Sequence, residues 1–139
     1  MAARYVLDSF ALMALFQEEP GAAKVQELLA GAQRGEHELY MSVVNLGEMV
    51  YTVGNRRGLE ASQEALAAAD QLPIEIVGVD RPLALSAARL KAASGIGYAD
   101  CFVAALAQRL GGAVVTGDPH FRQVEHLVAV EWLPSADTQ

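Results

Sequence analysis

Short apolar segments that alternate with helical segments are the feature that most constrains the fold of this chain. Apolar, β-branched and aromatic residues predict strands at residues 4–8, 38–42, 74–79, 113–118 and 127–133. Helical periodicity and capping residues predict helices at residues 10–17, 22–33, 43–58, 59–72, 83–94 and 98–110. Strands separated by helices pair in parallel through right-handed crossovers. We therefore expect an α/β fold in which helices cover both faces of a parallel sheet.

The length and composition are typical of a single domain. The chain has 139 residues, of which 53% are hydrophobic, and this is enough for one buried core. No apolar run approaches the length of a membrane span, so we expect no association with a membrane. The single cysteine, Cys101, excludes an internal disulfide and is typical of a cytoplasmic protein. We expect one domain over residues 1–134 and a loose C-terminal tail over residues 135–139.

The net charge of −7 argues against binding a polyanion through bulk charge. A function on nucleic acid would require a local basic surface or bound metal ions.

Four acidic residues stand at informative places along the predicted elements. Asp8 ends the first strand and Asp118 follows the fourth, so both lie at the carboxyl edge of the sheet, where open α/β folds bind ligands. Glu48 lies about two turns into the helix after the second strand, among apolar neighbours, and an unpaired carboxylate buried there would be costly. Asp100 lies in the first turn of the helix that begins at Tyr98. Simpler interpretations remain open, because Asp8 could be a helix cap, Asp100 a first-turn acid and Asp118 a turn residue.

Three segments and the spacing between them resemble a PIN domain. They are YVLDSFALMALF at residues 5–16, SVVNLGEMV at residues 42–50 and YADCFVAALAQRLGGAVVTGDPHF at residues 98–121. The sequence is most similar to the small single-domain toxins of the VapC type, over nearly the whole chain. The resemblance implies a three-layer α/β/α sandwich around a central, mostly parallel sheet of four to five strands, forming a single PIN-like nuclease domain.

The resemblance also implies a divalent-metal site. Catalytic and metal-binding roles carry over to four acids, which are Asp8, Glu48, Asp100 and Asp118. Ser9, Asn45 and Thr116 are candidates for polar support around them. The sequence departs from the family at His120, where relatives often carry another acid or a polar residue, and we assign His120 no ligand role.

The chemistry of these residue types agrees with phosphodiester hydrolysis. Carboxylates that converge repel one another, and Mg²⁺ or Mn²⁺ relieves the repulsion because hard cations prefer oxygen ligands. A water activated in such a site is a sufficient nucleophile. We therefore predict a metal-dependent endoribonuclease. The candidate RNA contacts are Arg56, Arg57, Arg89 and Lys91, for which ordinary solvated helix surface is an equally good interpretation.

The resemblance to VapC-type toxins implies a small antitoxin partner and a homodimer. The main alternative is a catalytically silent PIN-like module that only binds proteins. Other enzymes with this kind of fold fit less well. A receiver domain would carry paired early acids and a late lysine, a haloacid-type phosphatase would carry an acid where Phe10 stands, and a dinucleotide-binding fold would carry GxGxxG after the first strand.

Overall fold

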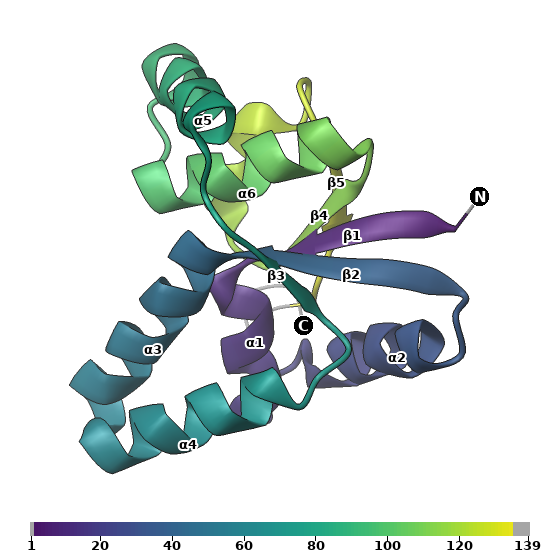
Figure 1. Cartoon of the computed structure of the whole chain (residues 1–139), viewed down its shortest axis with the longest axis vertical. Coiled ribbons are helices and arrows are strands. Elements are labelled where there is room, and N and C mark those ends of the chain that lie inside the picture. Colours follow the sequence, from purple (N-terminus) through teal and green to yellow (C-terminus); the bar gives the residue numbers. More distant parts are fainter. Residues whose placement is uncertain (1, 135–139) are drawn as a thin grey trace.

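The computed structural model describes residues 2–134 and contains one five-stranded sheet (Figure 1). Its strands are β1 (Ala3–Leu7), β2 (His37–Ser42), β3 (Glu75–Val77), β4 (Ala113–Thr116) and β5 (Ala129–Trp132). They lie in the order β3-β2-β1-β4-β5, and every pair is parallel. The predicted α/β fold with a mostly parallel sheet is confirmed. The predicted tail at residues 135–139 lies outside the described part of the chain.

Each predicted helix is present, with boundaries shifted by a residue or two at most. The helices are α1 (Ser9–Phe16), α2 (Ala22–Gln33), α3 (Val43–Arg57), α4 (Leu59–Asp70), α5 (Arg81–Ser94) and α6 (Tyr98–Leu110). A 3-10 helix, η1 (Pro119–Val124), was not predicted. Within residues 2–134, no single helix has the length and apolar character to span a membrane, and the α5–α6 pair that has them together bends by 117° at its junction.

Three strands are shorter than predicted, because neighbouring residues form turns and caps instead. Ile74 donates its backbone N–H to Leu72, which places it in a turn before β3. Asp118 is the N-cap of η1, so β4 ends at Thr116. Leu127 bonds back to Val124, and β5 therefore begins only at residue 129.

Side chains that alternate along each strand supply the two sides of the core. Val6 and Val114 pack in the cluster beneath α5 and α6. Leu7 and Val115, the next residues along, pack in the opposite cluster against α1, α2, α3 and α4. Helices therefore cover both faces of the sheet, as Figure 1 shows with α5 and α6 on one side and the four earlier helices on the other. Period-two alternation of apolar residues produces these layers directly.

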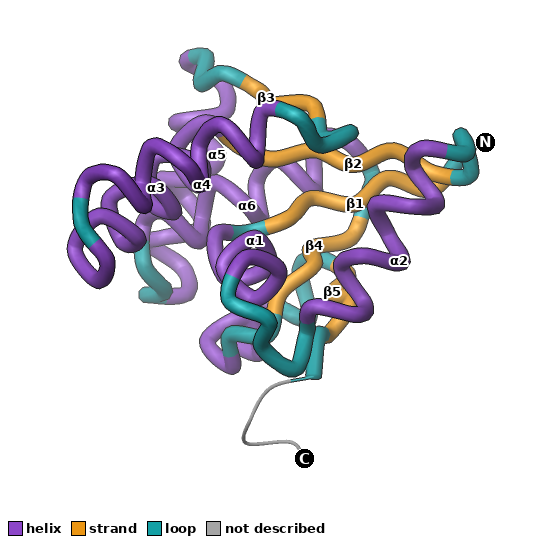
Figure 2. The backbone as a smooth tube through the Cα atoms, turned by 90° about the horizontal axis from the view of Figure 1, so that it is seen from below, coloured by secondary structure: helices purple, strands orange, loops and turns teal. Residues whose placement is uncertain are grey.

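The strand order sets the position of a ligand site. The strands β2 and β3 extend the sheet from one edge of β1, and the chain then returns to add β4 and β5 along the other edge of β1 (Figure 2). The order of strands therefore reverses between β1 and β4, and in open parallel sheets this switch point is where ligands bind. Asp8 and Asp118 follow these two strands, and the backbone N–H of Asp8 bonds to the Val115 carbonyl at 3.3 Å.

Candidate active site

Asp8 is the most deeply buried acid at the carboxyl edge of the sheet. It is the N-cap of α1, where its Oδ1 accepts a hydrogen bond from the Ala11 N–H at 2.9 Å. Its Oδ2 accepts a second hydrogen bond from the hydroxyl of Thr116, the last residue of β4. Only 2% of Asp8 is exposed and Thr116 is fully buried. Two donors therefore hold the carboxylate in one orientation across the switch point.

Thr116 also connects Asp8 to Asp118. Its Oγ1 accepts the backbone N–H of Asp118 at 3.0 Å while its hydroxyl donates to Asp8. Asp118 in turn caps η1 by accepting the backbone N–H of His120 at 2.9 Å, and the imidazole Nδ1 of His120 lies 2.9 Å from the same carboxylate oxygen. The polar support predicted for Thr116 thus has a defined geometry, and His120 lies against Asp118.

Glu48 approaches the site from α3. It is partly buried, and its Oε1 accepts a hydrogen bond from the Ser9 hydroxyl at 2.7 Å. Because Ser9 begins α1, directly after Asp8, this bond ties the Glu48 carboxylate to the end of β1. Ser9 and Glu48 were both named as candidates from the sequence, and the structure brings their side chains into contact.

Asn45 links the helix that carries Glu48 to the helix that carries Asp100. Its side chain is fully buried, and Nδ2 donates to the Ala99 carbonyl at 3.0 Å. Its Oδ1 is buried without a hydrogen-bond partner among residues 2–134. A buried polar atom that lacks a partner is costly, and an ion or a water bound beside it would provide the missing partner. The hydrogen bond from Nδ2 to Ala99 holds α3 against the first turn of α6, which also carries Asp100.

The four acids are coupled electrostatically, although not every pair of them interacts. Burial raises the pKa of Asp8 from 3.8 to about 8, against the hydrogen bonds from Thr116 and Ala11, and the charges of Asp100 and Asp118 raise it further. Burial also raises the pKa of Asp100 to about 6, with added repulsion from Asp118 and Glu48 and an opposing effect of His120. Each acid is thus within electrostatic reach of another. Repulsion between like charges disfavours full ionisation of the four acids.

A cleft opens beside the acids, between α1 and α3. Its volume is about 310 Å³, and its lining residues are Ser9, Phe10, Met13, Glu19, Glu48, Thr52, Arg56 and Asp118. Four of these, Phe10, Met13, Glu19 and Thr52, were not identified as site residues from the sequence. The spacing of Glu48, Thr52 and Arg56, four residues apart along one helix, is the signal that could have found Thr52.

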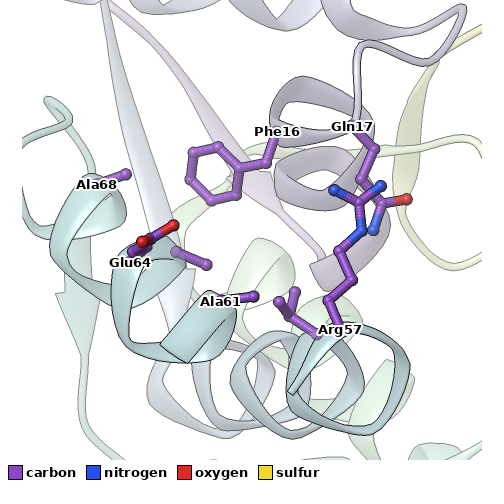
Figure 3. A pocket seen from close by; sticks show the side chains of 8 residues that line it. Phe16, Gln17, Arg57, Ala61, Glu64 and Ala68 are labelled. Carbon is purple, nitrogen blue, oxygen red and sulfur yellow. The ribbon is translucent and has the colours of Figure 1, made fainter. Parts of the chain in front are cut away.

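The four basic candidates occupy different places. Arg56 lines the acid cleft, whereas Arg57 lines a separate pocket between α1, α3 and α4 (Figure 3). Lys91 donates to the Gly95 carbonyl at the end of α5 at 3.3 Å, and Arg89 is exposed on α5. Of the four, only Arg56 lies in the cleft beside the acids.

The donors suit a hard divalent cation in their chemistry. Within residues 2–134, no three His, Cys, Asp or Glu side chains stand ready as a complete metal-binding group. The four acids nevertheless offer only oxygen atoms, which Mg²⁺ and Mn²⁺ prefer. The raised pKa values of Asp8 and Asp100 come mainly from burial, with a further contribution from repulsion among the acids, and a divalent cation would favour the charged form of both.

Comparisons with known proteins agree with this architecture. The PIN domain family model matches residues 5–127. One similar solved structure is a chain of VapBC2 from Rickettsia felis, in a complex with a DNA fragment from the VapBC2 promoter. It has a TM-score of 0.74 at 19% identity, over 94% of this chain and 99% of that chain. A sarcin-ricin loop cleaving VapC toxin from Mycobacterium tuberculosis has a TM-score of 0.74 at 18% identity, over 94% and 99% of the two chains.

VapBC-1 from nontypeable Haemophilus influenzae has a TM-score of 0.68 at 20% identity, over 93% of this chain and 97% of that chain. At these identities the likeness shows a shared fold. No curated protein matches the sequence at a significant level.

Proposed function

The chain belongs to the PIN domain family, and from this premise we propose that it is a divalent-metal-dependent endoribonuclease and the toxin of a toxin–antitoxin pair. The observation that carries the proposal is the cluster of four carboxylates at the switch point of the sheet, two of them with raised pKa values. A structural role alone does not account for such a cluster, because buried like charges destabilise a fold unless a cation or a proton compensates them.

The proposed metal ligands are Asp8, Glu48, Asp100 and Asp118. Mg²⁺ or Mn²⁺, when bound there, would supply positive charge that stabilises the phosphate and the leaving oxygen. Asp8 is suited to hold such a cation because Ala11 and Thr116 fix its orientation. Ser9 does the same for Glu48.

The remaining step is the activation of water. One carboxylate of the site would orient the attacking water and accept its proton. Attack by water on phosphorus, with departure of the 3′ oxygen, leaves a 5′-phosphate and a free 3′-hydroxyl. The ribose 2′-hydroxyl takes no part in this reaction.

We further propose a small antitoxin partner, a homodimer and a cytoplasmic location. Support for the antitoxin comes from the solved structures with this fold, which include VapBC proteins. An acidic site also suits a partner that inserts a basic side chain. The buried free thiol of Cys101 agrees with a reducing compartment.

The deciding experiment is RNA cleavage by the purified protein with Mg²⁺, with Mn²⁺ and in EDTA. We expect cleavage with either metal and none in EDTA. The Asp100→Asn protein, purified in the same way, controls for contaminating nucleases. Absence of cleavage with both metals would instead favour the catalytically silent, protein-binding alternative.

A further inference from the structure

The cleft between α1 and α3 has two unlike walls. On α3, Glu48, Thr52 and Arg56 stand four residues apart and therefore form one stripe along the helix. The stripe runs from an acid of the site to a cation, over about 12 Å of helix axis. On the other wall, Phe10 and Met13 of α1 form an apolar surface, and Glu19, which follows α1, adds a carboxylate. Asp118 also lines the cleft, so the cleft begins at the acid cluster and leads away from it.

Phe10 is held in place by the backbone beside Asp118. A Cβ added to Gly117 would lie 2.4 Å from Cε1 of Phe10, so the ring packs directly against this glycine. Gly117 is buried and separates Thr116 from Asp118. The ring of Phe10 remains partly exposed, and its contact with Gly117 positions it next to Asp118 in the cleft.

Arg56 has no salt bridge or hydrogen bond to another side chain within residues 2–134. Three other arginines are neutralised by an acid, in the pairs Arg4–Glu38, Arg34–Glu36 and Arg109–Asp80. An exposed guanidinium without a carboxylate partner, at the far end of a cleft that begins at a phosphodiester-cleaving site, is available for a phosphate.

We propose that this cleft is the subsite for the nucleotide that flanks the scissile bond, with its base against Phe10 and Met13 and its distal phosphate on Arg56. The inference rests on the proposed ribonuclease function and extends it to the recognition of single-stranded RNA. An aromatic face beside a cation is the arrangement by which proteins hold unpaired nucleotides. Thr52, between the two ends, supplies a hydroxyl for hydrogen bonds to the sugar or base.

The test is RNA binding, measured apart from cleavage. The Asp100→Asn protein would be titrated, in Mg²⁺, with a short fluorescent single-stranded RNA of mixed sequence and with an oligomer of equal length that lacks bases. Phe10→Leu should weaken binding of the RNA by about fivefold or more and leave binding of the abasic oligomer unchanged. Arg56→Gln should weaken both, and should reduce the slope of log K against log salt by about 0.7.

Matched controls are found in the separate pocket between α1, α3 and α4. Phe16 and Arg57 line that pocket, and Arg57 is adjacent to Arg56 on the same helix (Figure 3). Phe16→Leu and Arg57→Gln should leave both affinities and the salt slope unchanged. Thermal melts of all four variants verify that each is folded. If Phe10→Leu does not fold, Phe10→Met replaces it in the test, because Met is similar in volume to Phe and has no ring.

The outcomes separate the subsite from the enzyme. If the Asp100→Asn protein binds RNA and the two cleft variants bind it as tightly as their controls do, the subsite is wrong and the ribonuclease proposal stands. If the Asp100→Asn protein binds no RNA at all, the subsite is wrong, and the ribonuclease proposal is overturned with it only if the parent also fails to cleave RNA with either metal. Equal losses for RNA and abasic oligomer in Phe10→Leu would also overturn the placement of the base.

Discussion

Replacing Asp8 by asparagine should stabilise the metal-free protein at high pH, which is the opposite of what removal of a helix cap usually does. Asn cannot ionise, yet its oxygen can still accept the Ala11 N–H, and the bond to Thr116 can reverse, with the amide donating to Oγ1 of Thr116. The variant therefore imitates the protonated form of Asp8. Because Asp8 is only 2% exposed, its charged form carries the larger cost.

The pKa of Asp8 fixes both the sign and the pH range of the effect. Burial raises this pKa from 3.8 to about 8, so the folded protein holds the proton more tightly than the unfolded chain does. The stability that this proton supplies is complete below pH 4 and is lost as the pH rises through about 8. Each tenfold difference in proton affinity is worth about 1.4 kcal/mol, which sets a ceiling of about 6 kcal/mol.

The measured gain should be well below that ceiling, because the charged side chain can move toward water. We expect Asp8→Asn to match the parent near pH 4 and to exceed it by about 0.5–2 kcal/mol at pH 8. Chemical denaturation without metal, at several pH values, gives this difference. Mg²⁺ at a hundredfold excess over its dissociation constant should stabilise the parent by about 2.7 kcal/mol, and the variant should lose most of this gain.

Asp80 provides the matched control. It caps α5 through the same kind of bond, with Leu83 N–H donating to its Oδ1 at 2.8 Å, but it pairs with Arg109, and this bond lowers its pKa. Asp80→Asn should therefore lose stability near neutral pH and leave the metal effect intact. If Asp8→Asn behaved like Asp80→Asn, and metal did not stabilise the parent, Asp8 would be a structural cap and the metal-site argument would fail.

Three further predictions concern the reaction and its support. Asp100→Asn should abolish cleavage with little change in melting temperature, while His120→Ala should lower the rate modestly; equal loss in both would assign His120 a role that we do not give it. The products should carry a 5′-phosphate and a 3′-hydroxyl, as end-labelling would verify, and a 2′,3′-cyclic phosphate would contradict attack by water. Thr116→Val should cost about 1–3 kcal/mol of stability, because the Asp118 N–H loses its acceptor and Asp8 loses a donor. Thr116→Ser should retain both stability and cleavage. An equal loss of stability in the Ser and Val variants would show that the methyl group of Thr116 matters instead of its hydroxyl.

Much of the local structure could be predicted because it depends on neighbouring residues. Ser42 and Asp80 are of residue types that cap helices, and in the structure both side chains accept a backbone N–H from the helix that follows. Strand lengths were less predictable, because an edge residue such as Ile74 has strand propensity whether or not a partner strand reaches it. The turn η1 was missed for a similar reason, since Asp118 can end a strand or cap a helix with equal ease.

The amino-acid sequence by itself determined the α/β class and the edge at which Asp8 and Asp118 lie, because chain order and apolar period suffice for both. Only the tertiary structure placed β1 beside β4, and so joined these acids through Thr116. It also decided which of two adjacent arginines faces the acids. Neighbouring residues on a helix point about 100° apart, and the rotation of α3 is set by burial of Met49 and Val53 in the core, which directs Arg56 into the cleft and Arg57 away from it.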